Sequence, residues 1–140
     1  MDNQESARPG PGFMLIAVLA LLWNGFGATD YTMTQLHNQA WFDAMKVDLE
    51  MLAKVYAAPV WATAGWAVGV WGGFVGALAL LLRKRMAANL FLASIVGAVV
   101  GFSWQIGAGV NSLALASVIT GVAVFLFWYA RRAEGQGLLN

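Results

Sequence analysis

The stretch that decides the fold is Val60–Leu82, which reads VWATAGWAVGVWGGFVGALALLL and contains no charged residue. A helix needs about 20 apolar residues to cross the hydrocarbon core of a bilayer, so this stretch predicts a transmembrane helix. Three further apolar stretches lie at about 13–29, 86–106 and 112–130. None shows the alternation that is typical of a transmembrane β-strand. We therefore predict an all-α integral membrane four-helix bundle, with residues 1–140 forming a single transmembrane domain.

The composition of the whole chain agrees with this prediction. Hydrophobic residues make up 60% of the 140 residues and charged residues only 11%, whereas a soluble domain has roughly 25% charged residues. A nucleic-acid-binding protein would need a basic face, and the net charge is only +1. The chain has no cysteine, which excludes disulfides and thiolate metal sites. We expect the lipid bilayer, and not nucleic acid, as a partner.

The distribution of cationic residues predicts the orientation. Arg8, Arg83–Arg85 and Arg131–Arg132 place six cations on one side of the membrane, and Lys46 and Lys54 lie on the other among four acidic residues. Because loops that face the cytoplasm are enriched in Lys and Arg, we expect a multi-pass protein with both termini cytoplasmic. The first span is then a retained anchor rather than a signal peptide.

The segment 30–58 is the only sizeable part expected outside the membrane. Its apolar residues recur every three or four positions, which predicts one amphipathic external helix with a stripe of Phe42, Met45, Leu49, Leu52 and Tyr56. Thr34 or Asn38 is predicted to cap this helix, and Pro59 to end it. The pattern leaves three arrangements open: a lid packed on its own bundle, a helix on the membrane surface, or a face for a partner.

Glycines recur every four residues in the second and third spans. Gly65, Gly69 and Gly73 form such a row in the second span, and Gly97 and Gly101 continue it in the third. Small residues let helix backbones approach closely in lipid, so we predict that these glycines form helix-packing faces. The rows pack the two spans within one chain or, alternatively, form a self-association face.

The candidate site lies at the outer ends of the first and third spans, where Trp23-Asn24 and Trp104-Gln105 echo each other. Counting residues to each expected helix end places both amides at equal depth, roughly 9 Å below the end. Asn24 and Gln105 are then expected to hydrogen-bond with each other across the bundle. Alternatively, they line a small polar pocket with three further polar residues, Asp30, Tyr31 and His37.

No residue pattern typical of catalysis is present. His37 is the only histidine, whereas even a catalytic zinc site usually has three protein ligands. The predicted spans contain no Asp, Glu, Lys or Arg, which counts against a proton-coupled transporter. We therefore expect no enzyme, no metal and no cofactor.

Several motifs occur between Leu22 and Gln105: Trp23-Asn24, Met33-Thr34, Pro59–Ala64 (PVWATA) and Trp71–Gly73 (WGG), leading to Leu81–Arg85. In these motifs the chain resembles a family of small four-helix bacterial inner-membrane proteins, some of which carry the label "sugar transporter". The resemblance implies a four-span fold and the bacterial inner membrane as location. It implies no substrate and no catalytic residue.

Two functions are hypotheses at this point. The first is a non-enzymatic accessory or interaction subunit that binds other membrane proteins or itself, which the glycine rows, the tryptophans and the uncharged spans favour. The alternative is a small transporter or channel for a small polar solute, acting as an oligomer, which Asn24 and Gln105 favour.

Overall fold

The computed structural model describes residues 8–140, and the first seven residues of the predicted domain lie outside the described part. Its six helices are α1 Pro11–Gln35, α2 Gln39–Met45, α3 Leu49–Tyr56, α4 Val60–Leu81, α5 Met86–Gly107 and α6 Leu113–Gly135. Within residues 8–140 there is no strand. α1, α4, α5 and α6 are long and apolar enough to cross a membrane, which confirms the predicted all-α, four-span architecture.

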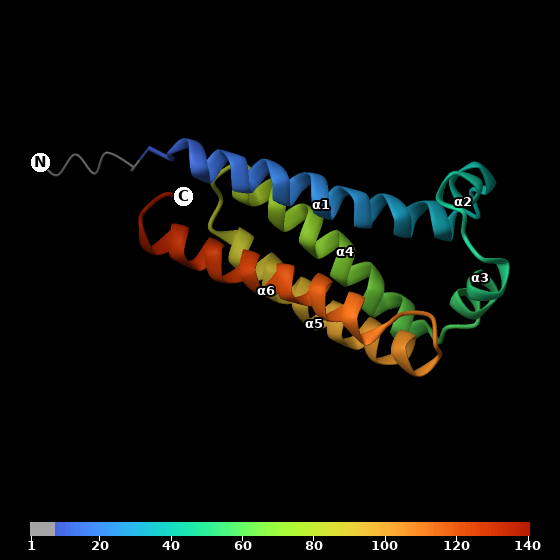
Figure 1. The fold of residues 1–140 in the computed structure, drawn as a ribbon. Helices are drawn as coiled ribbons and strands as arrows, with labels where there is room; N and C mark the ends of the chain where they lie inside the picture. Colours follow the sequence, from blue (N-terminus) through green and yellow to red (C-terminus); the bar gives the residue numbers. More distant parts are fainter. Residues whose placement is uncertain (1–7) are drawn as a thin grey trace, which may run out of the picture.

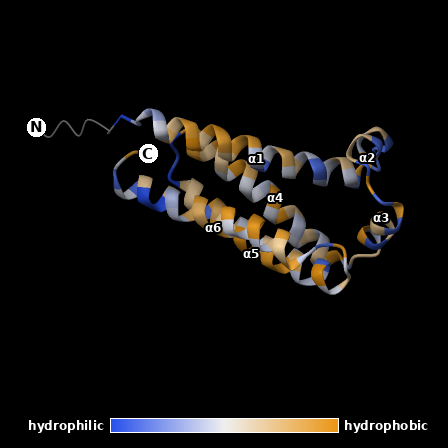
Figure 2. Cartoon of the chain, viewed as in Figure 1, coloured by the Kyte–Doolittle hydropathy of each residue, from blue (hydrophilic) through white to orange (hydrophobic). Residues whose placement is uncertain are grey.

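The four long helices run side by side along one bundle (Figure 1). The start of α1, the α4–α5 turn and the C-terminus lie at one end, which we call the terminal end. α2 and α3 lie at the opposite end, which we call the α2–α3 end. Apolar residues cover most of the long helices, and hydrophilic residues gather mainly at the two ends of the bundle (Figure 2).

The predicted boundaries hold for α4 and α5, but α1 and α6 are both longer than predicted. α6 continues from the expected end at 130 to Gly135, and α1 continues from 29 to Gln35. At the end of the predicted span and in the extra turns of α1, hydroxyl groups donate to carbonyls four residues earlier, which accommodates polar residues without ending the helix: Thr29, Thr32 and Thr34. At 1.5 Å per residue α1 is about 38 Å long, so it projects beyond a hydrocarbon core of about 30 Å.

The external segment forms two short helices, and the prediction of one amphipathic helix is wrong. α2 ends at Met45 because Lys46 adopts a left-handed conformation with a φ of 53°. Asp48 then begins α3, since its carboxylate accepts a hydrogen bond of 2.8 Å from the Glu50 N–H. The apolar stripe expected on one helix is therefore divided between two helices.

The caps of the external helices were partly predicted. Asn38 begins α2, because its side-chain oxygen accepts a hydrogen bond of 2.9 Å from the Trp41 N–H. The other predicted cap, Thr34, lies inside α1. α3 already ends at Tyr56, and Pro59 is the N-cap of α4.

The closest helix contact lies between α4 and α5. A Cβ atom added to Gly97 would lie 2.5 Å from the Gly69 nitrogen, and one added to Gly65 would lie 2.9 Å from the Gly101 nitrogen. The Ser94 hydroxyl also donates a hydrogen bond of 2.6 Å to the Gly69 carbonyl. Only glycine permits such a backbone approach, so the glycine rows join α4 to α5 within one chain.

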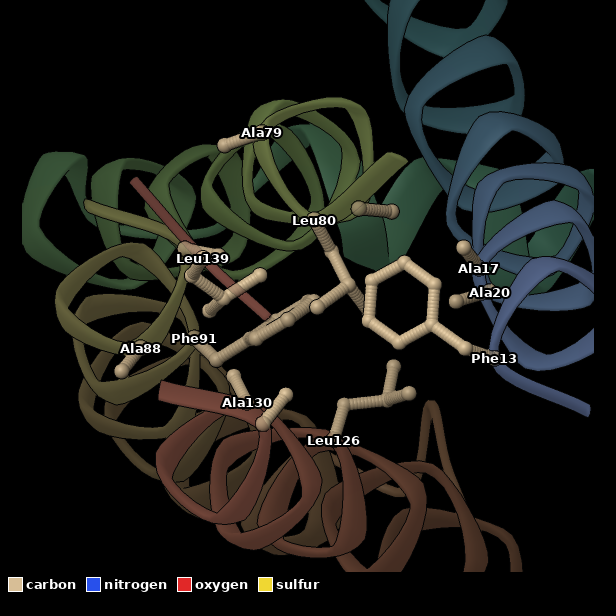
Figure 3. Packing of buried hydrophobic residues seen from close by; sticks show 13 residues of the cluster. Phe13, Ala17, Ala20, Ala79, Leu80, Ala88, Phe91, Leu126, Ala130 and Leu139 are labelled. Carbon is tan, nitrogen blue, oxygen red and sulfur yellow. The ribbon is translucent and has the colours of Figure 1, made fainter. Parts of the chain in front are cut away.

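All four spans meet in a buried apolar cluster at the terminal end. Phe13, Leu80, Phe91 and Leu126 come from four different helices and point toward one another (Figure 3). Leu139, which follows α6, fills the cluster from the end of the bundle and is only 1% exposed. The four helices are therefore joined most completely at this end.

The chain after α6 is fixed to the α4–α5 turn by backbone hydrogen bonds, in an arrangement that we call the tail clip. The Asn140 N–H donates to the Arg83 carbonyl at 2.6 Å, and the Arg85 N–H donates to the Asn140 carbonyl at 2.9 Å. The Arg83 side chain donates through Nε to the Leu138 carbonyl at 2.8 Å. Together these bonds hold Leu139 in the cluster.

Candidate functional site

Asn24 lies in the middle of the bundle, where α1, α4 and α5 meet. Its side-chain Nδ2 donates a hydrogen bond of 2.8 Å to the Ala20 carbonyl one turn earlier. The position of a Cβ on Gly73 lies 3.1 Å from Asn24 Cγ and 3.2 Å from Ser94 Oγ. Gly73 therefore leaves the space that the Asn24 amide occupies between the three helices.

Gln105 lies near the end of α5, at the α2–α3 end of the bundle. Its Oε1 accepts a hydrogen bond of 3.2 Å from Asn111 Nδ2, and its backbone carbonyl accepts from the Val110 N–H at 2.9 Å. Together with Thr63 and Trp104, Gln105 also lines a cavity of about 10 Å³, which is room for about one water molecule. This side chain therefore stabilises the α5–α6 turn.

The predicted hydrogen bond between the two amides is not formed in the structure. Gln105 lies eleven residues beyond Ser94 on α5, or about 16 Å, whereas Asn24 lies beside Ser94. The equal depth was wrong because it assumed that the first span ends near Asp30 and the third near Asn111, whereas α1 continues to Gln35 and α5 already ends at Gly107.

The other three predicted pocket residues face three different neighbours. Asp30 accepts a hydrogen bond of 2.9 Å from the Trp41 indole, Tyr31 packs edge-on against Trp66, and His37 stacks on Tyr56 at 4.3 Å. The first two contacts hold α2 and α4 against α1, and the third holds α3 against the turn that follows α1. The structure does not bring the three residues together with Asn24 and Gln105 around one pocket.

Tyr56 connects the end of α3 to the end of α1. Its hydroxyl donates a hydrogen bond of 2.7 Å to the Thr34 carbonyl. Partial burial raises the pKa of the Tyr56 hydroxyl above its usual value, which favours the protonated form that donates this bond.

An open apolar groove of about 490 Å³ lies between α1 and α4, and we call it the α1–α4 groove. All of its lining residues come from these two helices: Leu21, Leu22, Gly25, Phe26, Ala28, Thr29, Thr32, Met33, Trp71 and Phe74. From Leu21 to Met33 the groove follows α1 for about 18 Å, from the predicted span into the turns that project beyond it.

The groove has an apolar floor and an exposed aromatic rim. Gly25 faces the Phe74 ring, 3.5 Å from the position of an added Cβ, while Leu22, Phe26 and Trp71 are exposed. The two threonines of the lining use their hydroxyls to bond α1 itself, at 2.7 Å in both cases. The groove therefore offers shape and apolar contact to a ligand rather than hydrogen bonds.

The sequence analysis did not predict this groove, although one signal was present. Gly25 and Gly27 belong to α1, and the rows of small residues were sought only in the second and third spans. Gly25 faces Phe74 and Gly27 faces Val70, both on α4. Small residues on one helix opposite large residues on the next mark the groove.

Comparison with models of protein families, with curated proteins and with solved structures finds no match to this chain. The motif resemblance over residues 22–105 therefore identifies no family. By length and apolar composition of its helices, the chain is a multi-pass membrane protein with four candidate spans. No cluster of three or more potential metal ligands occurs in residues 8–140.

Proposed function

We propose that this protein is a non-enzymatic membrane subunit that binds an apolar transmembrane segment of another membrane protein, or of a second copy, in the α1–α4 groove. The observation that carries the proposal is the groove itself, which is about 490 Å³ in volume and lies between α1 and α4, two of the four candidate spans. Helices associate in lipid through close packing around small residues, and Gly25 provides a small residue in this groove.

The glycine rows of α4 and α5 support the choice of the groove as the binding surface. Gly69 and Gly97 already lie against the backbone of the neighbouring helix in the same chain. A partner segment therefore has to use a different surface, and the α1–α4 groove combines a small residue with exposed aromatic side chains.

A photocrosslinking experiment tests this proposal. The chain has no cysteine, so a single introduced cysteine is its only thiol and can carry a benzophenone group. We expect Leu22→Cys and Phe26→Cys, at the rim of the groove, to give protein adducts in native membranes. Val118→Cys, which is also exposed but lies on α6, is the matched control and should give none.

The mass of the adduct identifies the occupant. Twice the mass of the chain means a second copy, and any other defined mass means a different protein. Gly25→Leu, which fills the groove, should abolish the adduct, whereas Gly121→Leu, whose added side chain meets open space, should leave it unchanged. Adducts with lipid alone, or equal protein adducts from Val118→Cys, would refute the proposal.

We also propose that the terminal end faces the cytoplasm of a bacterium, at its inner membrane. The six cations of Arg8, Arg83–Arg85 and Arg131–Arg132 belong to this end, which supports the orientation. In intact cells, a membrane-impermeant maleimide should label Ala44→Cys, and it should label Gln136→Cys only after the inner membrane is permeabilised. The reverse pattern would overturn the orientation.

A second candidate function is transport of a small polar solute by an oligomer. The observation that favours it is the half-buried Asn24 amide beside Ser94 in the middle of the bundle. Under this alternative, Asn24→Leu should abolish solute uptake by vesicles that contain the protein, while Gly25→Leu should leave uptake unchanged.

A further inference from the structure

α3 is a short helix outside the four spans, and the protein leaves much of its apolar surface uncovered. None of its eight residues is buried. Leu49 is 72% exposed and Met51 is 43% exposed, although both are large apolar residues. The charged residues of α3, Glu50 and Lys54, lie one turn apart on a single stripe, which leaves the remaining surface apolar.

The position of α3 is fixed at its end. The Tyr56 hydroxyl bonds the Thr34 carbonyl of α1, and the Tyr56 ring stacks on His37 with an interplanar angle of 14°. Asp48 caps the start of the helix. α3 is therefore an ordered helix whose apolar surface is held in a defined place.

The length of α4 indicates where this apolar surface lies relative to the membrane. α3 ends only three residues before Pro59, the N-cap of α4, and the 22 residues of α4 are about 33 Å long, enough to reach both faces of the hydrocarbon core. Val60 and Trp61 begin α4 and are 86% and 53% exposed, so lipid has to cover them. The apolar surface of α3 continues this lipid-facing surface at the level of the headgroups.

We propose that α3 lies in the headgroup layer of the membrane leaflet at the α2–α3 end, with its apolar residues against the acyl chains and Glu50 and Lys54 toward water. An amphipathic helix in the plane of a membrane buries its apolar face at the boundary between headgroups and acyl chains. The occupant of this surface is thus lipid, and neither a second copy nor another protein. The inference is independent of the α1–α4 groove and of the orientation of the protein.

Depth-dependent fluorescence quenching tests this inference. The full chain, carrying an environment-sensitive fluorophore at Leu49→Cys, Met51→Cys or Glu50→Cys, is reconstituted in phosphatidylcholine vesicles. The lipids carry a nitroxide either near the headgroup or near the end of the acyl chain. Glu50→Cys is the matched control, because it lies on the same helix within the polar stripe. Unchanged circular dichroism shows that each variant is folded.

We expect the headgroup-level nitroxide to quench the fluorophores at Leu49 and Met51 about twofold more than the one at Glu50, and more than the deep nitroxide does. Equal quenching at all three positions would overturn the proposal, because α3 would then lie in water. Fluorophores that are shielded from water but not quenched by either lipid would also overturn it, because protein would then cover α3.

Discussion

The two sides of α4 make opposite kinds of contact with its neighbours. Toward α5, glycines allow close packing: Gly69 lies against the Gly97 backbone, and Gly76 lies against the Phe91 ring. Toward α1, α4 presents large side chains, and the Phe74 ring lies against Gly25. The side toward α5 has no groove, and the side toward α1 leaves the α1–α4 groove. An aromatic ring opposite a glycine can therefore close a helix contact or hold it open, according to what surrounds the pair.

The largest expected difference between the two sides comes from removing the aromatic ring on each. Phe91 is 0% exposed, so Phe91→Ala leaves a cavity and should lower the free energy of unfolding by about 3–5 kcal/mol. Phe74 borders an open groove, where lipid can take the place of the ring, so Phe74→Ala should cost about 1 kcal/mol. Thermal or denaturant unfolding in detergent measures both. Similar losses would mean that the two sides are packed alike.

A side chain added to the glycine row should disrupt the contact between α4 and α5 directly. Gly97→Leu places atoms where the backbone of α4 lies and should destabilise the bundle by about 3 kcal/mol. Gly121→Leu, in α6, is the matched control within a span, because a Cβ there meets nothing within 4 Å. Equal unfolding temperatures for the two variants would show that α4 and α5 do not depend on backbone contact.

On the side of α4 that faces α1, a small added side chain should raise the free energy of unfolding instead of lowering it. The Cβ of Gly25→Ala would lie 3.5 Å from the Phe74 ring, an ordinary contact, and alanine is the better helix former. We expect stabilisation of up to about 1 kcal/mol, whereas Gly97→Ala should destabilise. Unfolding curves that shift in the same direction for both variants would contradict the distinction between the two sides.

The smallest expected effect is a coupling close to zero between Asn24 and Gln105. Because the two amides bond separate partners, the free-energy changes of Asn24→Ala and Gln105→Ala should add within about 0.5 kcal/mol. A double-mutant cycle measures the difference. A coupling near 1.5 kcal/mol would mean that the amides share a contact, as the sequence analysis predicted.

The spans of α4 and α5 were predictable because each is a uniform apolar stretch that begins or ends at a proline or at charged residues. Pro59 precedes one helix, and the Arg83–Arg85 turn separates it from the next. The end of α1 was not predictable in this way, because Asp30 resembles the end of a span and instead lies in a helix that projects out of the membrane. The error in the depth of Asn24 follows from this error in helix length.

The break between α2 and α3 and the α1–α4 groove could not be predicted from the apolar pattern. Lys46 takes a left-handed conformation that a lysine does not favour, so its residue type does not indicate a helix end. The spacing of the apolar residues also continues through this position, and it therefore predicted one helix instead of two. The groove depends on which face of α1 turns toward α4. α1 is apolar on nearly all sides, so its sequence pattern does not show which face packs against α4.

The tail clip sets an order of events during biosynthesis. α4 and α5 are neighbours in the chain and can pair as soon as both have left the translocon. Leu139 follows α6, so the clip to Arg83 and Arg85 forms only after the last span is inserted. Until then the apolar cluster around Phe91 lacks one of its walls. A nascent chain arrested within α6 should therefore be more accessible to proteases at this end than a chain that includes residues 136–140.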